Sequence, residues 1–154
     1  MLVAIFCFRN NSFKSQSNKE KQWKMKRLLE NPNRGGKGTV NVLIVDDDEH
    51  ITRTFSRILT RKGYKTDIAQ TGAEAIKKAT AQHFNVALVD ICLPDINGME
   101  LLPQLGDHDG KMIKIVITGF PTMAKDNVHP DAYLLKPVKP QELLSLIDQK
   151  TSQT

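Results

Sequence analysis

Two short apolar runs in this chain of 154 residues lead directly into carboxylates. Residues 86–89 are followed by Asp90, and residues 42–45 are followed by Asp46 and Asp47. Continuous apolar runs without polar alternation are typical of strands that are buried on both faces of a parallel sheet. Because neighbouring strands lie about 4.8 Å apart, these carboxylates should meet at one edge of the sheet. Their mutual repulsion favours a bound cation, and Mg²⁺ prefers oxygen ligands of this kind.

Two further runs place complementary groups at the same edge. Residues 113–117 are followed by Thr118, and residues 132–135 are followed by Lys136. A lysine ammonium can pair with Asp90 or with a phosphoryl oxygen, and a threonine hydroxyl can donate a hydrogen bond to the same oxygen. Since ligands of open α/β sheets bind beyond the carboxyl ends of the strands, we expect the site at this edge.

The motifs that contain these residues resemble the receiver domain of two-component response regulators, of the stand-alone, chemotaxis-regulator-like kind. They are V-D-D at 45–47, V-D at 89–90, L-P-D-x-x-G at 93–98, I-T-G at 117–119 and Y-L-L-K-P at 133–137. Alternating strand and helix patterns predict an α/β fold with a doubly wound, five-stranded parallel sheet. The resemblance adds the flavodoxin-like strand order 2-1-3-4-5.

The resemblance also implies a role for each residue. Asp90 is the phosphoacceptor, with a sensor histidine kinase as phosphodonor, and Lys136 neutralises the phosphoryl oxygens. Thr118 follows the phosphoryl group and Tyr133 turns inward behind it, which makes a two-state surface for a partner. Pro137 occupies the position of a cis peptide bond in the family.

The magnesium ligands implied by the resemblance are Asp47 directly, Asp46 through water, Asp90, and the backbone carbonyl of Cys92. The alternative for Asp46 and Asp47 is simple N-capping of the helix that follows. Cys92 and Phe120 flank the approach of hydrolytic water in the family and are poorly suited to orient it. We therefore expect a long-lived acyl phosphate, formed and lost by self-phosphorylation and autodephosphorylation without other enzymatic activity.

Helical periodicity and start signals predict the elements between the strands. A capping box at Thr71 and Glu74 opens one helix, Pro103 limits the regularity of another, and Pro140 begins the last. The helices are expected at 49–62, 71–82, 97–105 and from residue 140, with a further strand at 64–69.

The segment between Thr118 and Lys136 is short for a receiver domain. Only 17 residues intervene, and Pro121 and Pro130 bracket its centre, which leaves at most two turns for the fourth helix. A shortened fourth helix removes part of the usual docking and dimerising face of the family. This argues against conventional dimerisation.

Positive charge is concentrated at the N-terminus. Residues 1–39 contain nine basic and two acidic residues, for a net +7, whereas residues 40–154 carry a net −2. We divide the chain into a basic, mostly disordered extension (1–39), a receiver domain (40–150) and a tail (151–154). The extension is either a basic arm for nucleic acid, acidic lipid or a partner, or a solvated leader. We prefer the leader, because no recognition fold is present, and do not expect a nucleic-acid partner.

Residues 1–8 are apolar but far shorter than the roughly 20 residues of a membrane span, and they lack the flanks of a signal peptide. Cys7 and Cys92 form neither a disulfide framework nor a zinc motif. We therefore expect a cytoplasmic protein. Because no output domain is visible, its signal should pass through a downstream protein or a phosphotransfer partner.

Two other functions remain open. A Mg²⁺-dependent phosphohydrolase of similar topology would use the same acidic cluster and lysine. Such enzymes typically carry a second aspartate two residues after the nucleophile, where this chain has Cys92. A non-phosphorylated binding module would act through the basic N-terminal arm, and a salt-dependent DNA affinity that requires residues 1–39 would favour it.

Overall fold

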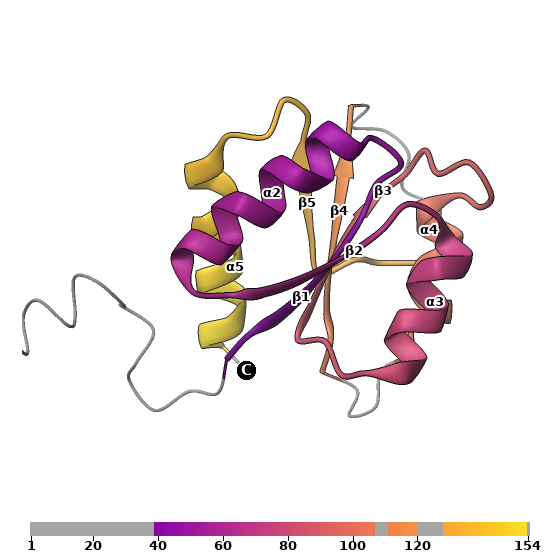
Figure 1. Ribbon diagram of the computed structural model, residues 1–154, viewed down its shortest axis with the longest axis horizontal. Coiled ribbons are helices and arrows are strands. Elements are labelled where there is room, and N and C mark those ends of the chain that lie inside the picture. The colour runs from indigo at the N-terminus through magenta and orange to yellow at the C-terminus, as the bar shows by residue number, and fades with distance from the viewer. Residues whose placement is uncertain (1–38, 107–110, 120–127, 154) are drawn as a thin grey trace, which may run out of the picture. The chain divides into compact units, whose positions relative to one another are not determined.

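The computed structural model describes residues 39–106, 111–119 and 128–153. The chain divides into two units, 1–37 and 38–154, and the described residues all belong to the second. This unit is built on a five-stranded parallel sheet with the order β2-β1-β3-β4-β5 (Figure 1). The strands are β1 (Asn41–Val45), β2 (Lys65–Ala69), β3 (Val86–Asp90), β4 (Ile113–Thr118) and β5 (Ala132–Leu135). The expected fold class and strand order are confirmed.

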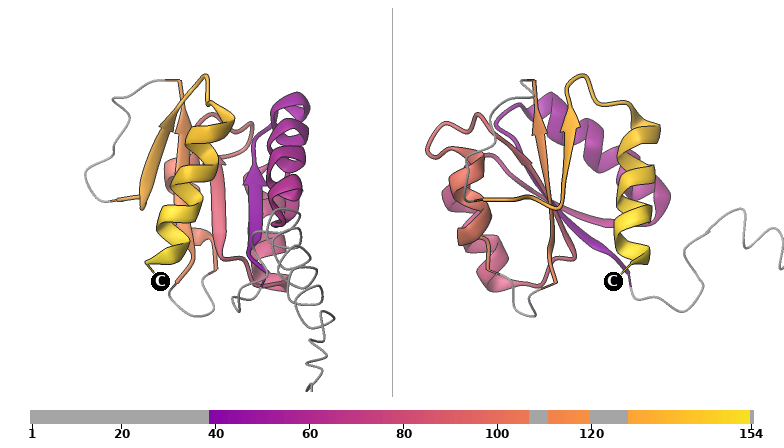
Figure 2. Two further views of the ribbon diagram at one scale, coloured as in Figure 1. Left: turned by 90° about the vertical axis from the view of Figure 1, so that its left-hand side faces the viewer. Right: turned by 180° about the vertical axis from the view of Figure 1, so that it is seen from behind.

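Helices cover both faces of the sheet. The helices α2 and α5 lie on one face, and α3 and α4 lie on the other, as Figure 1 and the view from behind in Figure 2 show. Their bounds are α2 (Glu49–Lys62), α3 (Gly72–Ala81), α4 (Gly98–Leu101) and α5 (Pro140–Ser152), with a 3₁₀ turn, η1 (Leu102–Gln104), after α4.

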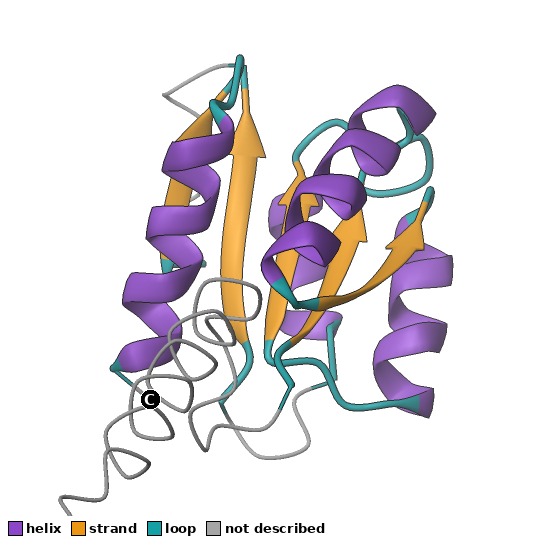
Figure 3. Ribbon diagram, turned by 60° about the vertical axis from the view of Figure 1, so that its left-hand side comes forward, coloured by secondary structure: helices purple, strands orange, loops and turns teal. Residues whose placement is uncertain are grey.

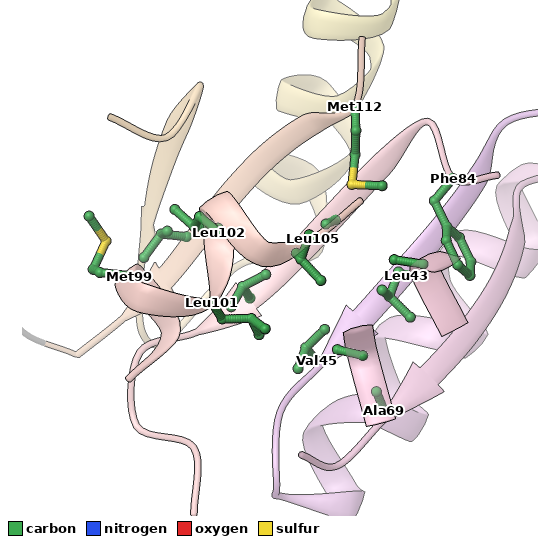
Figure 4. Packing of buried hydrophobic residues seen from close by; sticks show 14 of the residues in the cluster. Leu43, Val45, Ala69, Phe84, Met99, Leu101, Leu102, Leu105 and Met112 are labelled. Carbon is green, nitrogen blue, oxygen red and sulfur yellow. The ribbon is translucent and has the colours of Figure 1, made fainter. Parts of the chain in front are cut away.

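The alternation of side chains along each strand divides the core into two clusters. On β1, Leu43 and Val45 face the cluster beneath α3 and α4, whereas Val42 and Ile44 face the cluster beneath α2 and α5. Figure 4 shows the first cluster, in which Leu101 and Leu102 meet residues of the sheet. Because both faces are covered, all five residues of β3 are buried, which explains its continuous apolar run.

Helix ends follow the capping signals of the sequence with one difference. Asp48 is the N-cap of α2, and Gly63 ends that helix with a φ of 98°, a left-handed conformation that glycine adopts readily. Thr71 caps α3 by accepting a hydrogen bond from Glu74 N. The carboxylate of Glu74 accepts from Gln70 N rather than from Thr71 N, so the capping box closes one residue earlier than its usual form.

Several element boundaries differ from the sequence prediction. The segment expected as one helix at 97–105 becomes α4 followed by η1, with Pro103 in the 3₁₀ turn, because proline cannot donate the backbone hydrogen bond of a regular helix. Strand β2 begins at Lys65, one residue late. Helix α5 continues to Ser152, so the boundary expected after residue 150 falls inside a helix.

Several expectations lie outside the described residues. They concern the disorder of residues 1–38, the shortened fourth helix in the segment 120–127, and Phe120. Within the residues that are described, no helix is long and apolar enough to cross a membrane.

Candidate functional site

The strands of the sheet end at one edge, and their arrowheads point the same way in Figure 3. In the register of β1 and β3, Val45 pairs with Val89. The next residue on each strand is therefore a carboxylate, Asp46 on one and Asp90 on the other. Both side chains are buried, with 2% and 6% of the residue surface exposed. Two acids are thus held next to each other in a poorly solvated place.

Strands β4 and β5 bring Thr118 and Lys136 to the same edge. Asp90 lies opposite Ile117 on β4, and Thr118 lies opposite Leu135 on β5. The backbone N–H of Lys136 donates to the Thr118 carbonyl oxygen at 2.8 Å, which fixes the start of the lysine side chain. Thr118 itself is buried.

One ammonium bridges the two buried carboxylates. Nζ of Lys136 lies 2.8 Å from Oδ1 of Asp90 and 3.0 Å from Oδ2 of Asp46. The second oxygen of each acid accepts a backbone hydrogen bond: Asp90 Oδ2 from Cys92 N at 2.7 Å, and Asp46 Oδ1 from Asp48 N at 2.9 Å. In each carboxylate, one oxygen therefore pairs with the Lys136 ammonium, and the other accepts a hydrogen bond from a backbone N–H two residues later.

The charges at this edge do not balance. Two carboxylates face one ammonium, and burial raises the pKa of Asp46 above its usual value, although the Asp48 N–H and Lys136 oppose this and the charge of Asp90 adds to it. Burial lowers the pKa of Lys136, but its hydrogen bonds to Asp90 and Asp46 outweigh that effect and the net shift is upward. The lysine is thus firmly cationic, and the pair of acids would accept further positive charge.

Asp47 directly follows Asp46 at this edge of the sheet. Its side chain is exposed. Within the described ranges, no group of three or more histidine, cysteine, aspartate or glutamate side chains is arranged to hold a metal ion. Asp46 and Asp90 share the ammonium of Lys136, and the role of Asp47 as a direct magnesium ligand stays a prediction.

The chemistry of the donors nevertheless suits a hard divalent cation. Asp46 and Asp90 present buried oxygens that reach one common ammonium, and the exposed Asp47 follows Asp46 directly in the chain. Mg²⁺ commonly binds through one or two carboxylates and keeps several waters. The charge of Asp90 beside Asp46 is one of the causes that raise the pKa of Asp46, after burial, and a cation between the two acids would offset that repulsion.

Three other residues were singled out from the sequence, namely Tyr133, Cys92 and Pro137. Tyr133 is 43% exposed on β5, so its ring faces outward. Cys92 is an exposed free cysteine whose backbone N–H contacts Asp90. The Lys136–Pro137 peptide bond is cis.

Two residues near the site were not assigned a role from the sequence. Asp95, in the loop after β3, accepts hydrogen bonds from the first turn of α3. Gly98 allows α4 to start against β3, because a Cβ there would lie 2.1 Å from the Asp90 carbonyl oxygen. The L-P-D-x-x-G motif contained both residues, but only a placed α3 shows what Asp95 binds.

The amino-acid sequence matches the family described as the response regulator receiver domain over residues 42–148. The chain belongs to this family. Receiver domains in general are signalling proteins rather than enzymes, and those of this kind typically bind Mg²⁺ at their phosphorylation site. Response regulators related to this chain are phosphorylated by sensor histidine kinases.

Relatives with longer chains share the receiver region. A probable transcriptional regulator, ycf29, of Porphyra purpurea is 35% identical over 114 residues, which cover 70% of this chain and 54% of that protein. Response regulator ArlR of Staphylococcus epidermidis is 32% identical over 111 residues, covering 70% of this chain and 50% of ArlR. This receiver chain thus spans about half the length of the curated relatives it matches.

Two solved structures match over all or nearly all of their length. A CheY-like receiver domain from Methanospirillum hungatei has 37% sequence identity and a TM-score of 0.67, with 76% of this chain and 100% of that chain covered. TrrA of Thermotoga maritima, solved in complex with Mg²⁺-BeF, has 25% identity and a TM-score of 0.66, with 73% and 99% covered.

Proposed function

We propose that this receiver domain is a phosphorylation-dependent switch whose acceptor is Asp90 and whose output is altered binding of a partner. One observation carries the proposal. The buried carboxylates of Asp46 and Asp90 share the ammonium of Lys136 at 3.0 and 2.8 Å, at the open edge of a parallel sheet. This is where an incoming phosphoryl group would find a nucleophile and a fixed cation together.

The proposed transfer is an in-line displacement at phosphorus. An Asp90 carboxylate oxygen forms the new bond to phosphorus while the bond from phosphorus to the histidine nitrogen of a kinase breaks, and that electron pair leaves with the imidazole. Lys136 offsets the negative charge of the phosphoryl oxygens without titrating, since its raised pKa keeps it cationic. Thr118, buried at the end of β4, would donate its hydroxyl to one of those oxygens.

Mg²⁺ in this proposal is held by Asp46, Asp47, Asp90 and the Cys92 carbonyl, and when bound it would supply positive charge to the phosphoryl oxygens. The crowded, buried pair of acids supports this part of the proposal. The related TrrA was solved with Mg²⁺-BeF, which supports the same choice of ion.

The switch would connect Asp90 to the surface around β5. Thr118 would move toward the phosphoryl group, and the outward-facing Tyr133 would turn into the space behind it. A shallow hollow of about 460 Å³ lies between β5 and α5 and is lined by Tyr133, Leu135 and Leu146 among others. Rotation of Tyr133 would change this hollow, so we propose it as the face that a downstream protein reads.

A sensor histidine kinase is the proposed phosphodonor, and the downstream partner is proposed only as a protein or phosphotransfer protein. We also propose a cytoplasmic location, on the sequence argument that its two cysteines show no disulfide pattern. Division of the chain at residue 39 into an extension and a receiver domain remains part of the same proposal.

The test is chemical phosphorylation of the full chain. The protein is incubated with Mg²⁺ and acetyl phosphate, and intact mass is measured for wild type and Asp90→Asn. We expect one added phosphoryl group that hydroxylamine removes, and none on Asp90→Asn. Continuous release of phosphate from acetyl phosphate without an accumulating adduct would instead identify a phosphohydrolase. Absence of both would overturn the proposed function.

A further inference from the structure

The loop after Asp90 is fastened to a helix from another part of the chain by the side chain of Asp95. Its Oδ1 accepts a hydrogen bond from Gly72 N at 2.8 Å, and its Oδ2 accepts one from Ala73 N at 2.9 Å. Both donors lie in the first turn of α3, where N–H groups lack partners within the helix. These two hydrogen bonds hold the pKa of Asp95 below its usual value, so it is ionised at neutral pH. The helix dipole favours a carboxylate at the same place.

Apolar packing reinforces this attachment. A Cβ on Gly72 would lie 2.2 Å from Cγ2 of Ile96. Because residue 72 has no side chain, Ile96 can pack against the N-terminal end of α3. Ile96 and Leu93 are partly buried against the core cluster beneath α3 and α4. The tip of the loop therefore has a polar and an apolar attachment to the same helix end.

The other end of the loop closes on the phosphoacceptor. Cys92 pairs with Asn97 in an isolated antiparallel bridge, and Gly98 N donates to the Ile91 carbonyl oxygen at 2.8 Å. The N–H of Cys92 then reaches Oδ2 of Asp90 at 2.7 Å. The loop is short and closed at its base. When Asp95 attaches the tip of the loop to α3, it therefore also restricts the position of the Cys92 backbone.

We infer that Asp95 is a positioning residue for the phosphorylation site. By binding the first turn of α3, it holds the backbone of Cys92 where the N–H contacts Asp90 and where the carbonyl would take part in binding Mg²⁺. The magnesium part of this inference rests on the proposed function. The placement of the Cys92 N–H does not, since it concerns contacts within the protein alone.

The chain offers a matched control for the test. Thr71 caps the same helix by accepting a hydrogen bond from Glu74 N at 3.1 Å, within its own segment. Thr71→Ala therefore weakens the N-terminal end of α3 as Asp95→Ala does. It leaves in place the hydrogen bonds that join α3 to the loop after Asp90. Asp95→Asn keeps an oxygen that can accept one of the two bonds, and so serves as a milder variant if Asp95→Ala folds poorly.

Two measurements on the full chain test the inference. Hydrogen exchange of the Cys92 amide, followed by NMR without metal, should become about tenfold faster in Asp95→Ala, less so in Asp95→Asn, and stay within about twofold of wild type in Thr71→Ala. Mg²⁺ affinity, measured by calorimetry, should fall about tenfold in Asp95→Ala and stay unchanged in Thr71→Ala, as for other groups that orient a ligand.

The outcomes separate the two proposals. If Asp95→Ala leaves Cys92 exchange at the wild-type rate, or if Thr71→Ala accelerates it equally, Asp95 only caps a helix and the inference is overturned. If Cys92 exchange depends on Asp95 while wild type accepts no phosphoryl group, the positioning role stands and the proposed function fails.

Discussion

The ammonium of Lys136 lies 2.8 Å from Oδ1 of Asp90, so a side chain that follows the fifth strand reaches the carboxylate that ends the third. The fourth strand lies between them and carries Thr118 at its end. Lys136 also reaches Asp46 of the neighbouring first strand. One flexible side chain thus connects the ends of strands across the middle of the sheet, and it supplies the compensating charge for two buried acids.

Replacing Lys136 by methionine should destabilise the fold. The change leaves Asp46 and Asp90 buried together without their cation, and we expect a loss of about 2 kcal/mol in the free energy of unfolding, measured with urea. Mg²⁺ should restore more of this loss in Lys136→Met than it adds to wild type. Lys139→Met is the control, because the Lys139 side chain is 76% exposed and its pair with Glu142 is long, at 3.8 Å. Equal losses in both variants would contradict this account.

Replacing Asp46 by asparagine should stabilise the protein at neutral pH. Burial raises the pKa of Asp46 from its usual 3.8, so the ionised form is less favourable in the folded state than in the unfolded chain. Removing the charge should add about 1 kcal/mol, or roughly 4 °C in Tm. The same change should weaken Mg²⁺ binding, because an amide is a poorer ligand than a carboxylate. Calorimetric Tm with and without Mg²⁺ measures both effects.

The pH dependence of this effect has a definite sign. A carboxyl group whose pKa is raised in the folded state stabilises the fold at pH values below its unfolded pKa of 3.8. This stabilisation is lost as the pH rises through the pKa of the folded state. The stability advantage of Asp46→Asn over wild type should therefore be small near pH 3.5 and grow as pH increases. A stability advantage of Asp46→Asn that shrinks as the pH rises would contradict a raised pKa for Asp46.

The fold and the edge that carries the site could be inferred from the sequence because both depend on local patterns. Strands such as β3 are buried on both faces, so they appear as continuous apolar runs, and the residue after each run must lie at the carboxyl edge. The position of Asp90 beside Asp46 follows from this rule and the strand order alone. The strand order itself came from the family resemblance.

Features that depend on several elements at once could not be inferred. Asp95 binds amide groups 22 and 23 residues earlier in the chain, and no local pattern predicts that contact. The shift of the Glu74 hydrogen bond to Gln70 N likewise reflects the way β2 enters α3.

Replacing Gly98 by alanine should disrupt the site through the backbone. A Cβ at this residue would lie 2.1 Å from the Asp90 carbonyl oxygen and 2.9 Å from the Ile91 Cα, so the start of α4 and the end of β3 must separate. We expect a loss of about 3 kcal/mol in the free energy of unfolding and a slower reaction with acetyl phosphate. Gly106→Ala is the control, since its Cβ would meet only Ala79 O at 3.7 Å. A Gly98→Ala protein as stable as that control would show that the close approach is not required.

The residue at position 92 should control how long the acyl phosphate lasts. The exposed Cys92 follows Asp90 by two residues, and its thiol is a weak hydrogen-bonding group that orients water poorly. We expect the wild-type acyl phosphate to persist well beyond a few seconds in Mg²⁺. Cys92→Asp should shorten its lifetime at least about tenfold, because a carboxylate can act as a base toward attacking water. Cys92→Ala, which retains the backbone N–H bonded to Asp90, should leave the lifetime nearly unchanged. Decay is followed by intact mass after removal of the phosphodonor, and wild-type decay within seconds would show that another group already activates water.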